Sequence, residues 1–445
     1  MHRRRSLASL AALALALPLS VALQSPAAAD ELSLSHFQLR PNSYGTDLQT
    51  RADNLPLVKA TVTDIMNDLN RQDADNPVTY GEACEPAAVQ REDAEGDPVP
   101  PPAIIQSVCF NDGDNDTAEW YPQGVTTVAD MQADKEWGSG YQPVLVSWYD
   151  HHTGPKNPVK GVRITFMDPW SGAYRHVLLV YPRANGDYVS VRVSQDESNS
   201  DYSDSLHAGG ILWYGNYLFV ADTARGFRMF DMRRIYDLGA SKNGTTENKN
   251  SIGKVGNMYY GHAYRYIMPQ IGSWTRTAPT GTKCTESDGS PNFSYVSLDR
   301  SGTDHLIAGE YCDGDQATKG RVAAWPIAGA FDGDNNLIMD TSYRWNADAA
   351  HKLPESNIQG ATRFDGRWYL SQSRGQNKAG ILYTTEPATS STRTLQKDRE
   401  QNLSIDPEDL AHWQFGTDPA SPGLGYLWTV GEHPGKRMVY SVEPR

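Results

Sequence analysis

The sequence lacks the short motifs of several common enzyme classes. Its 445 residues contain no HExxH zinc motif, no P-loop, no GxSxG nucleophile turn and no GxGxxG that opens a helix. These absences exclude the simplest metalloprotease, nucleotide-binding and esterase interpretations. The four cysteines show no CxxC or Cys/His spacing that would indicate a zinc site.

Long apolar runs are also scarce. One run, residues 7–23, follows the basic residues 2–5 and precedes Ala27-Ala28-Ala29, which is the pattern of a secretory signal cut after Ala29. No later segment approaches the roughly 20 apolar residues that a transmembrane helix needs. We therefore expect a secreted, extracellular protein that does not reside in a membrane.

Positive charge is in the minority. Lys and Arg number 40 against 54 Asp and Glu, a net charge of −14, and loss of the three arginines in residues 1–29 would make it −17. Nucleic acids and anionic membranes require a basic face, so neither is an expected partner. An anionic substrate stays compatible, because a few local arginines can dominate one pocket.

The four cysteines predict disulfides, since these bonds persist outside the cell. Three connectivities are possible, and pairing of sequence neighbours is the simplest. It joins Cys84 to Cys109 in an N-terminal segment and Cys284 to Cys312 in a strand-rich region.

What the sequence does contain is a recurring unit, a glycine-centred entry followed by short apolar strands. It occurs at residues 122–126, 207–211 and 358–362. Glycine within a strand marks a close approach of another backbone, and the innermost strands of a β-propeller crowd a central channel in this way. We predict an all-β fold, a β-propeller. About 325 residues at roughly 40 to 50 per blade give six to eight blades, and we expect seven.

The expected organisation has three parts: the signal peptide 1–29, an irregular N-terminal extension 30–118 that packs on the main domain, and the propeller 119–445. Apolar residues at helical spacing predict one short helix within residues 55–69 of the extension. Residues 123–127, 144–149, 161–167 and 175–181 are predicted to be the four strands of one blade. A β-helix is disfavoured because its coils repeat at a shorter, stricter period.

Histidine and tyrosine residues near strand ends are the first candidates for chemistry. His207 precedes an inner strand and would face the channel, where an imidazole can move a proton near neutral pH. Its alternative role is a hydrogen bond to the backbone of a neighbouring blade. Tyr260 and His262 flank Gly261 in a second cluster, where a tyrosine can equally pack between blades. His151-His152 end a strand, and one of the two would face a ligand.

Arginines become important if the ligand is an acid, since a guanidinium clamps a carboxylate with two hydrogen bonds. Arg163, Arg225 and Arg265 are the predicted substrate-binding residues, although each could be an inter-blade residue. Residues 111–116 alternate aspartates as a calcium loop does, but Thr117 stands where an EF-hand needs glycine. We expect no required cofactor. Ca²⁺ is the one candidate ion, and its ligands are unknown. The alternative interpretation of residues 111–116 is a solvated acidic loop that binds no ion.

Several segments together resemble a known group of proteins. Residues 120–126, 160–166, 174–180, 207–211 and 432–437 resemble secreted actinobacterial and fungal proteins. Some of these are similar to the seven-bladed β-propeller lyases that release rhamnose from glucuronate in plant gums. The resemblance covers about residues 105–445. It implies a monomeric polysaccharide lyase whose partner is an extracellular uronate-containing polysaccharide or oligosaccharide. None of that family's catalytic residues is carried over.

The implied chemistry can be matched to residue types. β-Elimination at a uronate needs a group that neutralises the carboxylate, a base for the C5 proton and an acid for the leaving oxygen. We assign His207 as base, Tyr260 as acid and Arg265 or Arg225 as clamp, with His152 and His262 as alternates.

Two other functions stay open. One is a calcium-dependent lactonase or phosphoesterase propeller, which would need an inward cage of acidic side chains. The other is a non-catalytic glycan-binding protein, which would explain the 23 tyrosines and 11 tryptophans.

Overall fold

The computed structural model describes residues 32–42, 45–74, 76, 78–151, 159–192, 206–278, 284, 289–316, 318–388, 390, 393–415 and 423–444. The predicted signal peptide and the catalytic candidate His152 lie outside these residues. The described chain belongs to one compact unit that begins at Leu32.

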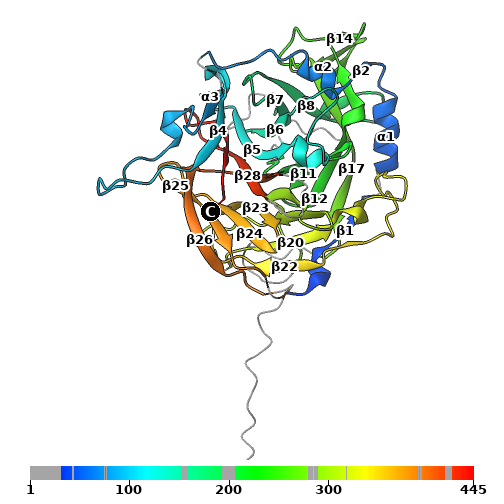
Figure 1. The fold of residues 1–445 in the computed structure, drawn as a ribbon. Coiled ribbons are helices and arrows are strands. Elements are labelled where there is room, and N and C mark those ends of the chain that lie inside the picture. The colour runs from blue at the N-terminus through cyan, green and yellow to red at the C-terminus, as the bar shows by residue number, and fades with distance from the viewer. Residues whose placement is uncertain are drawn as a thin grey trace, which may run out of the picture. The chain divides into compact units, whose positions relative to one another are not determined.

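Antiparallel meanders of short strands build this unit (Figure 1). The first meander contains the four strands that the sequence predicts, and its order is β5 (Trp120–Thr127), β6 (Val144–Asp150), β7 (Val162–Met167), β8 (Tyr174–Pro182), with β9 (Tyr188–Ser190) at the outer edge. All six residues of β7 are buried. This burial fits a sheet that is covered on both faces.

The second meander shares a strand with the first. It comprises β10 (Ile211–Tyr214), β11 (Tyr217–Asp222), β12 (Gly226–Asp231) and β17 (Tyr266–Arg276). The start of β17 pairs in parallel with β8, and its remainder pairs antiparallel with β12. Four short strands extend its edges: β1 (Gln38–Pro41), β2 (Val58–Ala60), β13 (Ile235–Asp237) and β21 (Trp345–Asn346).

Three further meanders follow. The third is β18 (Tyr295–Asp299), β19 (His305–Gly309), β20 (Arg321–Pro326) and β22 (Ala349–Lys352). The fourth is β23 (Ile358–Phe364), β24 (Arg367–Gln372), β25 (Ala379–Thr385) and β26 (Lys397–Ile405). The fifth is β27 (Ala411–Phe415), β28 (Gly423–Val430), β29 (Met438–Val442), β4 (Ile104–Cys109) and β3 (Thr79–Tyr80).

The remaining elements are small. A separate sheet contains β14 (Gly244–Thr245), β15 (Ile252–Val255) and β16 (Met258–Gly261). The helices are α1 (Gly45–Asp53), α2 (Val62–Met66), α3 (Asp112–Asn115) and α4 (Val128–Met131), with 3-10 turns at Leu34–Phe37, Pro86–Ala88, Met232–Arg234 and Ile327–Ala330. Among the described helices, none is long and apolar enough to cross a membrane.

The strand order agrees with the predicted β-propeller, but the expected count of seven blades is not confirmed. The described strands form five meanders of at least four strands each. The expected count came from dividing the strand-rich length by the length of a typical blade, which does not show how strands divide among sheets. In the structure β16 belongs to the small separate sheet, and β17 is shared between two meanders.

Glycines in the inner strands mark backbone crowding, as the sequence predicts. A Cβ on Gly124 of β5 would lie 2.7 Å from the backbone nitrogen of Ile211, at the start of β10. A Cβ on Gly210 would lie 2.2 Å from the nitrogen of Val296 in β18. Each contact joins one inner strand to the next. The inner strands therefore pack backbone to backbone around the axis.

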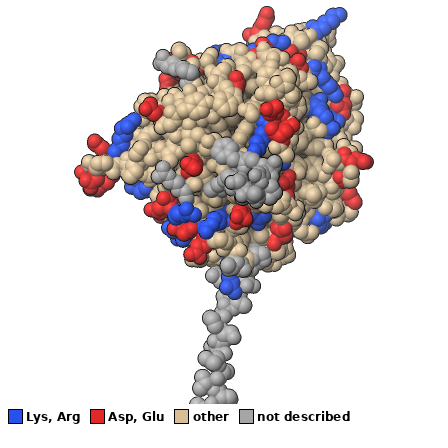
Figure 2. Space-filling model, viewed as in Figure 1, with Lys and Arg blue, Asp and Glu red and all other residues tan. Residues whose placement is uncertain are grey.

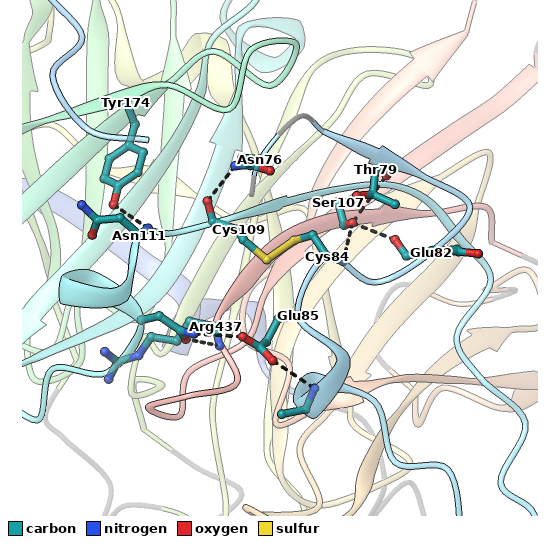
Figure 3. The surroundings of a disulfide bond; sticks show 12 residues. Asn76, Thr79, Glu82, Cys84, Glu85, Ser107, Cys109, Asn111, Tyr174 and Arg437 are labelled. Carbon is teal, nitrogen blue, oxygen red and sulfur yellow. Dashed lines mark hydrogen bonds between the residues drawn. A yellow bond between two sulfur atoms is a disulfide. The ribbon is translucent and has the colours of Figure 1, made fainter. Parts of the chain in front are cut away.

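The N-terminal segment, expected to pack on the main domain, also completes its last sheet. β4 pairs with β29 at the C-terminal end of the chain, and Figure 1 shows the light-blue β4 beside the red strands. Both predicted disulfides are present, Cys84–Cys109 and Cys284–Cys312. Cys109 ends β4, and its carbonyl accepts a hydrogen bond from Nδ2 of Asn76 (Figure 3).

The helix expected within residues 55–69 is shorter than predicted. Only Val62–Met66 is helical, because Thr61 forms a capping box with Asp64 and so fixes the start. Residues 58–60 instead form β2, which pairs with β13. On the face of the molecule in Figure 2, acidic and basic side chains are interspersed rather than segregated.

Candidate functional site at the axial mouth

Polar side chains gather where the inner strands begin. We call this region the axial mouth. The residues that define it come from β5, the end of β6, the segment before β10, β23, the segment before β27 and the β28–β29 loop; they are Tyr121, Gln123, Tyr149, His151, His207, Gln359, Asp406, Glu408, Asp409, Glu432, His433 and Arg437. Hydrogen bonds, an ion pair and ring contacts connect these residues in the pairs described below.

Asp409 binds the inner strands together. Its Oδ2 accepts hydrogen bonds from the backbone nitrogens of Val125, at 3.4 Å, and Ile211, at 3.3 Å. The side chain is completely buried. Burial raises the pKa of this carboxyl, while the backbone donors oppose that shift. Asp409 therefore stabilises the packing of the inner strands around the axis.

The buried Glu408 and the partly exposed Glu432 form a pair of carboxyl groups, each held by an amide. Nε2 of Gln123 donates to Oε1 of Glu432 at 2.7 Å, and Nε2 of Gln359 donates to Oε1 of Glu408 at 3.1 Å. Burial first, and then neighbouring carboxylates, raise both pKa values, that of Glu408 well above its usual range and that of Glu432 to about 7. A carboxyl that keeps its proton near neutral pH can act as a general acid.

Asp406 approaches this pair in an unusual backbone conformation. Its φ is 47°, in the left-handed region that non-glycine residues rarely adopt. The conformation accompanies an ion pair between its Oδ2 and Nε2 of His433, and a hydrogen bond from Oγ of Ser373 to its Oδ1. Strain of this kind often accompanies functional sites.

Asp406, Glu432 and His433 also have the spacing of a cation site. One donor atom from each lies within 4.8 Å of the others. By contrast, the aspartate-rich residues 111–116, which resemble a calcium loop, form α3 and its flanks. There Asp114 pairs with Arg163 at 2.7 Å and with His176 at 3.1 Å.

Aromatic rings border the carboxyl groups. The ring of Tyr149 lies 4.5 Å from that of the exposed His207, and Tyr121 lies 4.4 Å from His151. We call these four residues the aromatic shelf. Burial first, and then Glu432 and Glu408, raise the pKa of Tyr149, so its phenol stays protonated. Rings with partly exposed faces and polar edges are suited to stacking on sugars.

Arg437 fixes the loop that carries Glu432. It is fully buried, and its Nε donates to the carbonyl of Glu432 at 2.7 Å. Its Nη1 donates to the carbonyl of Asp114 at 2.8 Å, and its guanidinium lies 4.9 Å from the ring centroid of Tyr121. These contacts make Arg437 a positioning residue for the mouth.

The structure places the predicted catalytic residues in two regions. His207 lies in the mouth, whereas Tyr260 lies on β16, where its carbonyl accepts a hydrogen bond from the hydroxyl of Tyr188 on β9 at 2.8 Å. Three strand spacings, about 14 Å, separate β9 from β6, which carries the partner of His207. His262 is buried beside this second region, and its Nδ1 contacts the carbonyl of Lys249 at 3.0 Å. The structure therefore does not bring Tyr260 or His262 to His207.

The predicted substrate-binding arginines are dispersed. Arg163 is buried between the rings of Trp120 and Trp148, 4.6 Å from each centroid, and is paired with Asp114. Arg265 is bound to Asp237 and Asp68 at 2.8 and 2.7 Å. Arg225 lies in the turn between β11 and β12. Arg163 and Arg265 therefore form ion pairs between structural elements, which is the role that the sequence offered as the alternative to substrate binding.

Sequence reasoning missed the acidic side chains of the mouth. Asp406, Glu408 and Asp409 form a run directly before the apolar start of β27. That position corresponds to the polar residues that precede the other inner strands, so the run was a usable signal. Glu432 lies in residues 432–437, a segment quoted for the family resemblance, where it carried no assigned role.

Comparison with known proteins does not assign a family. No protein-family model matches the sequence, and no curated protein sequence matches it either. A GH43_1 enzyme from Xanthomonas citri is similar in structure with 11% identity over 73% of this chain and 88% of that chain, at a TM-score of 0.31. RS223 β-xylosidase has 11% identity over 73% and 92%, at 0.29.

A third solved structure is of a different kind. A protein described as an oxidoreductase (glucose dehydrogenase) from Thermus thermophilus has 13% identity over 84% of this chain and 99% of that chain, at a TM-score of 0.26. Scores this low carry no functional argument.

Proposed function

We propose that the protein is an extracellular carbohydrate-active enzyme that cleaves a glycosidic bond in its axial mouth by acid–base catalysis. One observation carries the proposal: the carboxyl groups of Glu432 and Asp406, with the buried Glu408 beside them, lie next to the aromatic shelf at the end of the propeller axis. Glycoside cleavage needs two carboxyl groups with different protonation states, beside a surface that holds the sugar ring.

Glu432 and Asp406 have the properties of the two catalytic groups. Glu432 is partly exposed and keeps its proton near neutral pH, so it can protonate the leaving glycosidic oxygen. Asp406, paired with His433, supplies the carboxylate that bonds to the anomeric carbon as the glycosidic bond breaks. Glu432, now ionised, takes a proton from the water that then displaces Asp406.

The separation of these groups predicts the stereochemistry. A carboxylate oxygen of Asp406 and one of Glu432 lie within 4.8 Å of each other. Retaining glycosidases place their carboxyl groups about 5 to 5.5 Å apart, whereas inverting enzymes leave roughly 6.5 to 9.5 Å for a water molecule. We therefore expect a product with the same anomeric configuration as the substrate.

β-Elimination at a uronate is the second candidate. The contact of His207 with the protonated Tyr149 favours it, because an imidazole base and a phenol acid lie side by side. The position of the expected clamp opposes it, because Arg265 is bound to Asp237 and Asp68 and lies outside the mouth. The two reactions leave different products.

The test uses the purified protein with neutral and uronate-bearing plant polysaccharides. Hydrolysis raises reducing ends without ultraviolet absorbance, whereas elimination produces an absorbing unsaturated uronate. Glu432→Gln should lower kcat for hydrolysis by roughly 10² to 10⁴. His207→Ala should raise KM with little change in kcat, since His207 contacts the sugar. Loss of kcat in His207→Ala together with an absorbing product would establish elimination instead. Sugar binding without turnover on every polysaccharide would support the non-catalytic alternative.

A calcium-dependent propeller is the competing use of the same acidic groups. If a cation occupied the space between Asp406, Glu432 and His433, dialysis against EDTA would abolish activity and CaCl₂ would restore it. Direct acid–base catalysis by the carboxyl groups predicts full activity after dialysis.

A further inference from the structure

A second pocket lies beside the first meander, formed by elements other than those that build the axial mouth. We call it the side pocket; its volume is about 560 Å³. It is lined by residues from β8, the segment after α2, the loops after β13 and β14, and the β16–β17 turn; they are Asn70, Arg71, Arg175, His176, Gly239, Thr246, His262, Ala263, Tyr264 and Arg265. A pocket of this size accommodates a ligand as large as a monosaccharide or disaccharide.

Three arginines from separate parts of the chain converge on the side pocket. Arg71 pairs with Asp114 at 3.3 Å, and Arg175 pairs with Asp68 at 3.0 Å. Arg265 shares Asp68 with Arg175 at 2.7 Å. A guanidinium has five N–H donors, so one or two ion-pair contacts leave donors for a further acceptor.

The carboxylates around the side pocket do not fully balance its cations. Asp114 also serves the buried Arg163, and Asp237 serves Arg265. Four described guanidinium groups therefore share three carboxylates. Burial is the main cause that lowers the pKa of Arg175; Asp68 and then Tyr266 oppose this shift, and the nearby cations Arg265 and Arg71 add to it. A bound anion would relieve the repulsion among these cations.

Both histidines of the side pocket are neutral at physiological pH. Burial is the main cause that lowers the pKa of His176 to about 3 and that of His262 to about 4. His262 and Ala263 also adopt left-handed φ values of 52° and 67°. Two successive non-glycine residues in this conformation are strained, and such strain gathers at binding sites.

From this juxtaposition we propose that the side pocket is a binding site for an anionic sugar unit, whose carboxylate or sulfate group is held by Arg71 and Arg175. Uronate and sulfate-ester groups share the chemistry that guanidinium donors recognise, at least two acceptor oxygens that share a negative charge. The neutral imidazoles and Tyr264 are suited to the hydroxyl groups of the same unit.

This site is independent of the reaction in the axial mouth. No residue of the mouth lines the side pocket, so it would retain or orient an acidic polysaccharide whether the mouth hydrolyses, eliminates or only binds. The side pocket would also attract an acidic polysaccharide locally, although the protein's net charge of −14 would otherwise repel it.

Isothermal titration calorimetry of the full protein tests the proposal with three probes: glucuronic acid, galactose 6-sulfate and glucose. We expect the two anions, or one of them, to bind at least tenfold more tightly than glucose, and added salt to weaken this binding. Preference for the uronate or for the sulfate identifies the source of the negative charge. Equal affinity for all three probes would overturn the proposal.

Two variants of the side pocket address the site without dismantling an ion pair that the fold needs. Arg71→Gln leaves Asp114 paired with Arg163 and His176, and should weaken anion binding about tenfold. Thr246→Trp changes no charge, and fills the pocket from an exposed position. Arg399→Gln is the matched control, because Arg399 is an exposed arginine of β26 whose one ion pair among the described residues is with Asp398.

The outcomes separate this site from the mouth. Weaker anion binding in Arg71→Gln and Thr246→Trp, with unchanged binding in Arg399→Gln and Glu432→Gln, supports the proposal. Unchanged binding in both pocket variants would overturn it, whatever the activity of the mouth. Loss of binding in Glu432→Gln alone would place the anion in the axial mouth.

Discussion

The protonation state of Glu432 should determine how the rate of the reaction in the mouth depends on pH. Its pKa of about 7 means that it is protonated below neutral pH and loses its proton as pH rises. A general acid works only when protonated, so the rate should fall on the alkaline side of about pH 7. In Glu432→Gln, kcat should decrease by roughly 10² to 10⁴ and the alkaline limb should disappear. A pH–rate profile of both proteins measures this.

Gln123 offers a control that leaves the catalytic group in place. Its amide donates to Glu432 and lowers the pKa of that carboxyl, against the larger effect of burial. Gln123→Leu removes the donor at nearly constant volume, so the pKa of Glu432 should rise and the alkaline limb should move to higher pH. A limb that stays at the same pH in Gln123→Leu would show that another group controls the rate.

The same buried acids predict how stability depends on pH. Burial raises the pKa of Glu432 to about 7, from a reference value of 4.5, and that of Asp130 to about 6, from 3.8. Between these values the two acids bind more protons in the folded state than in the unfolded state, so their contribution to the free energy of unfolding should fall as pH rises from about 4 to about 7. The lowered pKa values of His176 and His262 act in the opposite direction over this range, so a comparison of variants is needed. Urea unfolding at several pH values measures the slope, which Asp130→Asn should make less negative or more positive. An unchanged slope in Asp130→Asn would show that Asp130 has the same pKa in the folded and the unfolded protein.

Individual residues were predictable only where the signal is local. His207 could be found because glycines follow it directly and mark the inner strand. Glu408 and Glu432 could not be assigned as a pair, since their proximity depends on the amides of Gln359 and Gln123 from other strands. Tyr260 and Arg265 had suitable chemistry, but Tyr260 lies on β16 of the small separate sheet and Arg265 lies in the turn between β16 and β17.

The inner strands test the crowding argument at the level of elements. A Cβ on Gly210 would lie 2.2 Å from the backbone nitrogen of Val296, which cannot move without shifting β18. Gly210→Ala should therefore lower the free energy of unfolding by about 2 to 3 kcal/mol. Gly113→Ala is the control, because its nearest neighbour would be Oδ1 of Asn111 at 3.7 Å and its φ is not left-handed. Equal stability of the two variants, by chemical denaturation, would contradict close packing around the axis.

Elements with strong local patterns were predicted well. Turns that contain glycine separate the strands predicted for the first meander, and the structure confirms these strands as β5 to β8. The helix expected within residues 55–69 was too long, since apolar spacing did not reveal that residues 58–60 pair with β13. That pairing joins residues almost 180 positions apart, which is why tertiary contacts override the local periodicity.

At the scale of the whole molecule, a strand from the N-terminal extension and the last strand of the chain meet in one sheet. β4 pairs with β29, and this pairing closes the ring of meanders. The sequence predicted a propeller from its recurring units, but it could not show that a strand from the extension completes the last sheet. A strand that pairs across more than 300 residues leaves no periodic signal, so both the blade count and the boundary near residue 118 were drawn without it.

Ring closure also supports the axial mouth. Oε2 of Glu85, next to Cys84, accepts a hydrogen bond from Nδ2 of Asn115 at 3.0 Å, and Oδ1 of Asn115 accepts one from the backbone nitrogen of Arg437 at 2.9 Å (Figure 3). Arg437 holds the loop that carries Glu432. The disulfide Cys84–Cys109 therefore anchors both the closing strand and one wall of the mouth.

This connection separates the roles of two disulfides that close loops of similar length, 25 and 28 residues. Loop entropy alone predicts a loss of about 3 to 4 kcal/mol in unfolding free energy for either double Cys→Ser variant. Cys84→Ser with Cys109→Ser should additionally speed amide hydrogen exchange in β29 and lower kcat, since β4 and the Glu432 loop lose their anchor. Cys284→Ser with Cys312→Ser should lose stability while exchange in β29 and kcat stay unchanged. Equal exchange in β29 of both variants would mean that the ring stays closed without the Cys84–Cys109 bond.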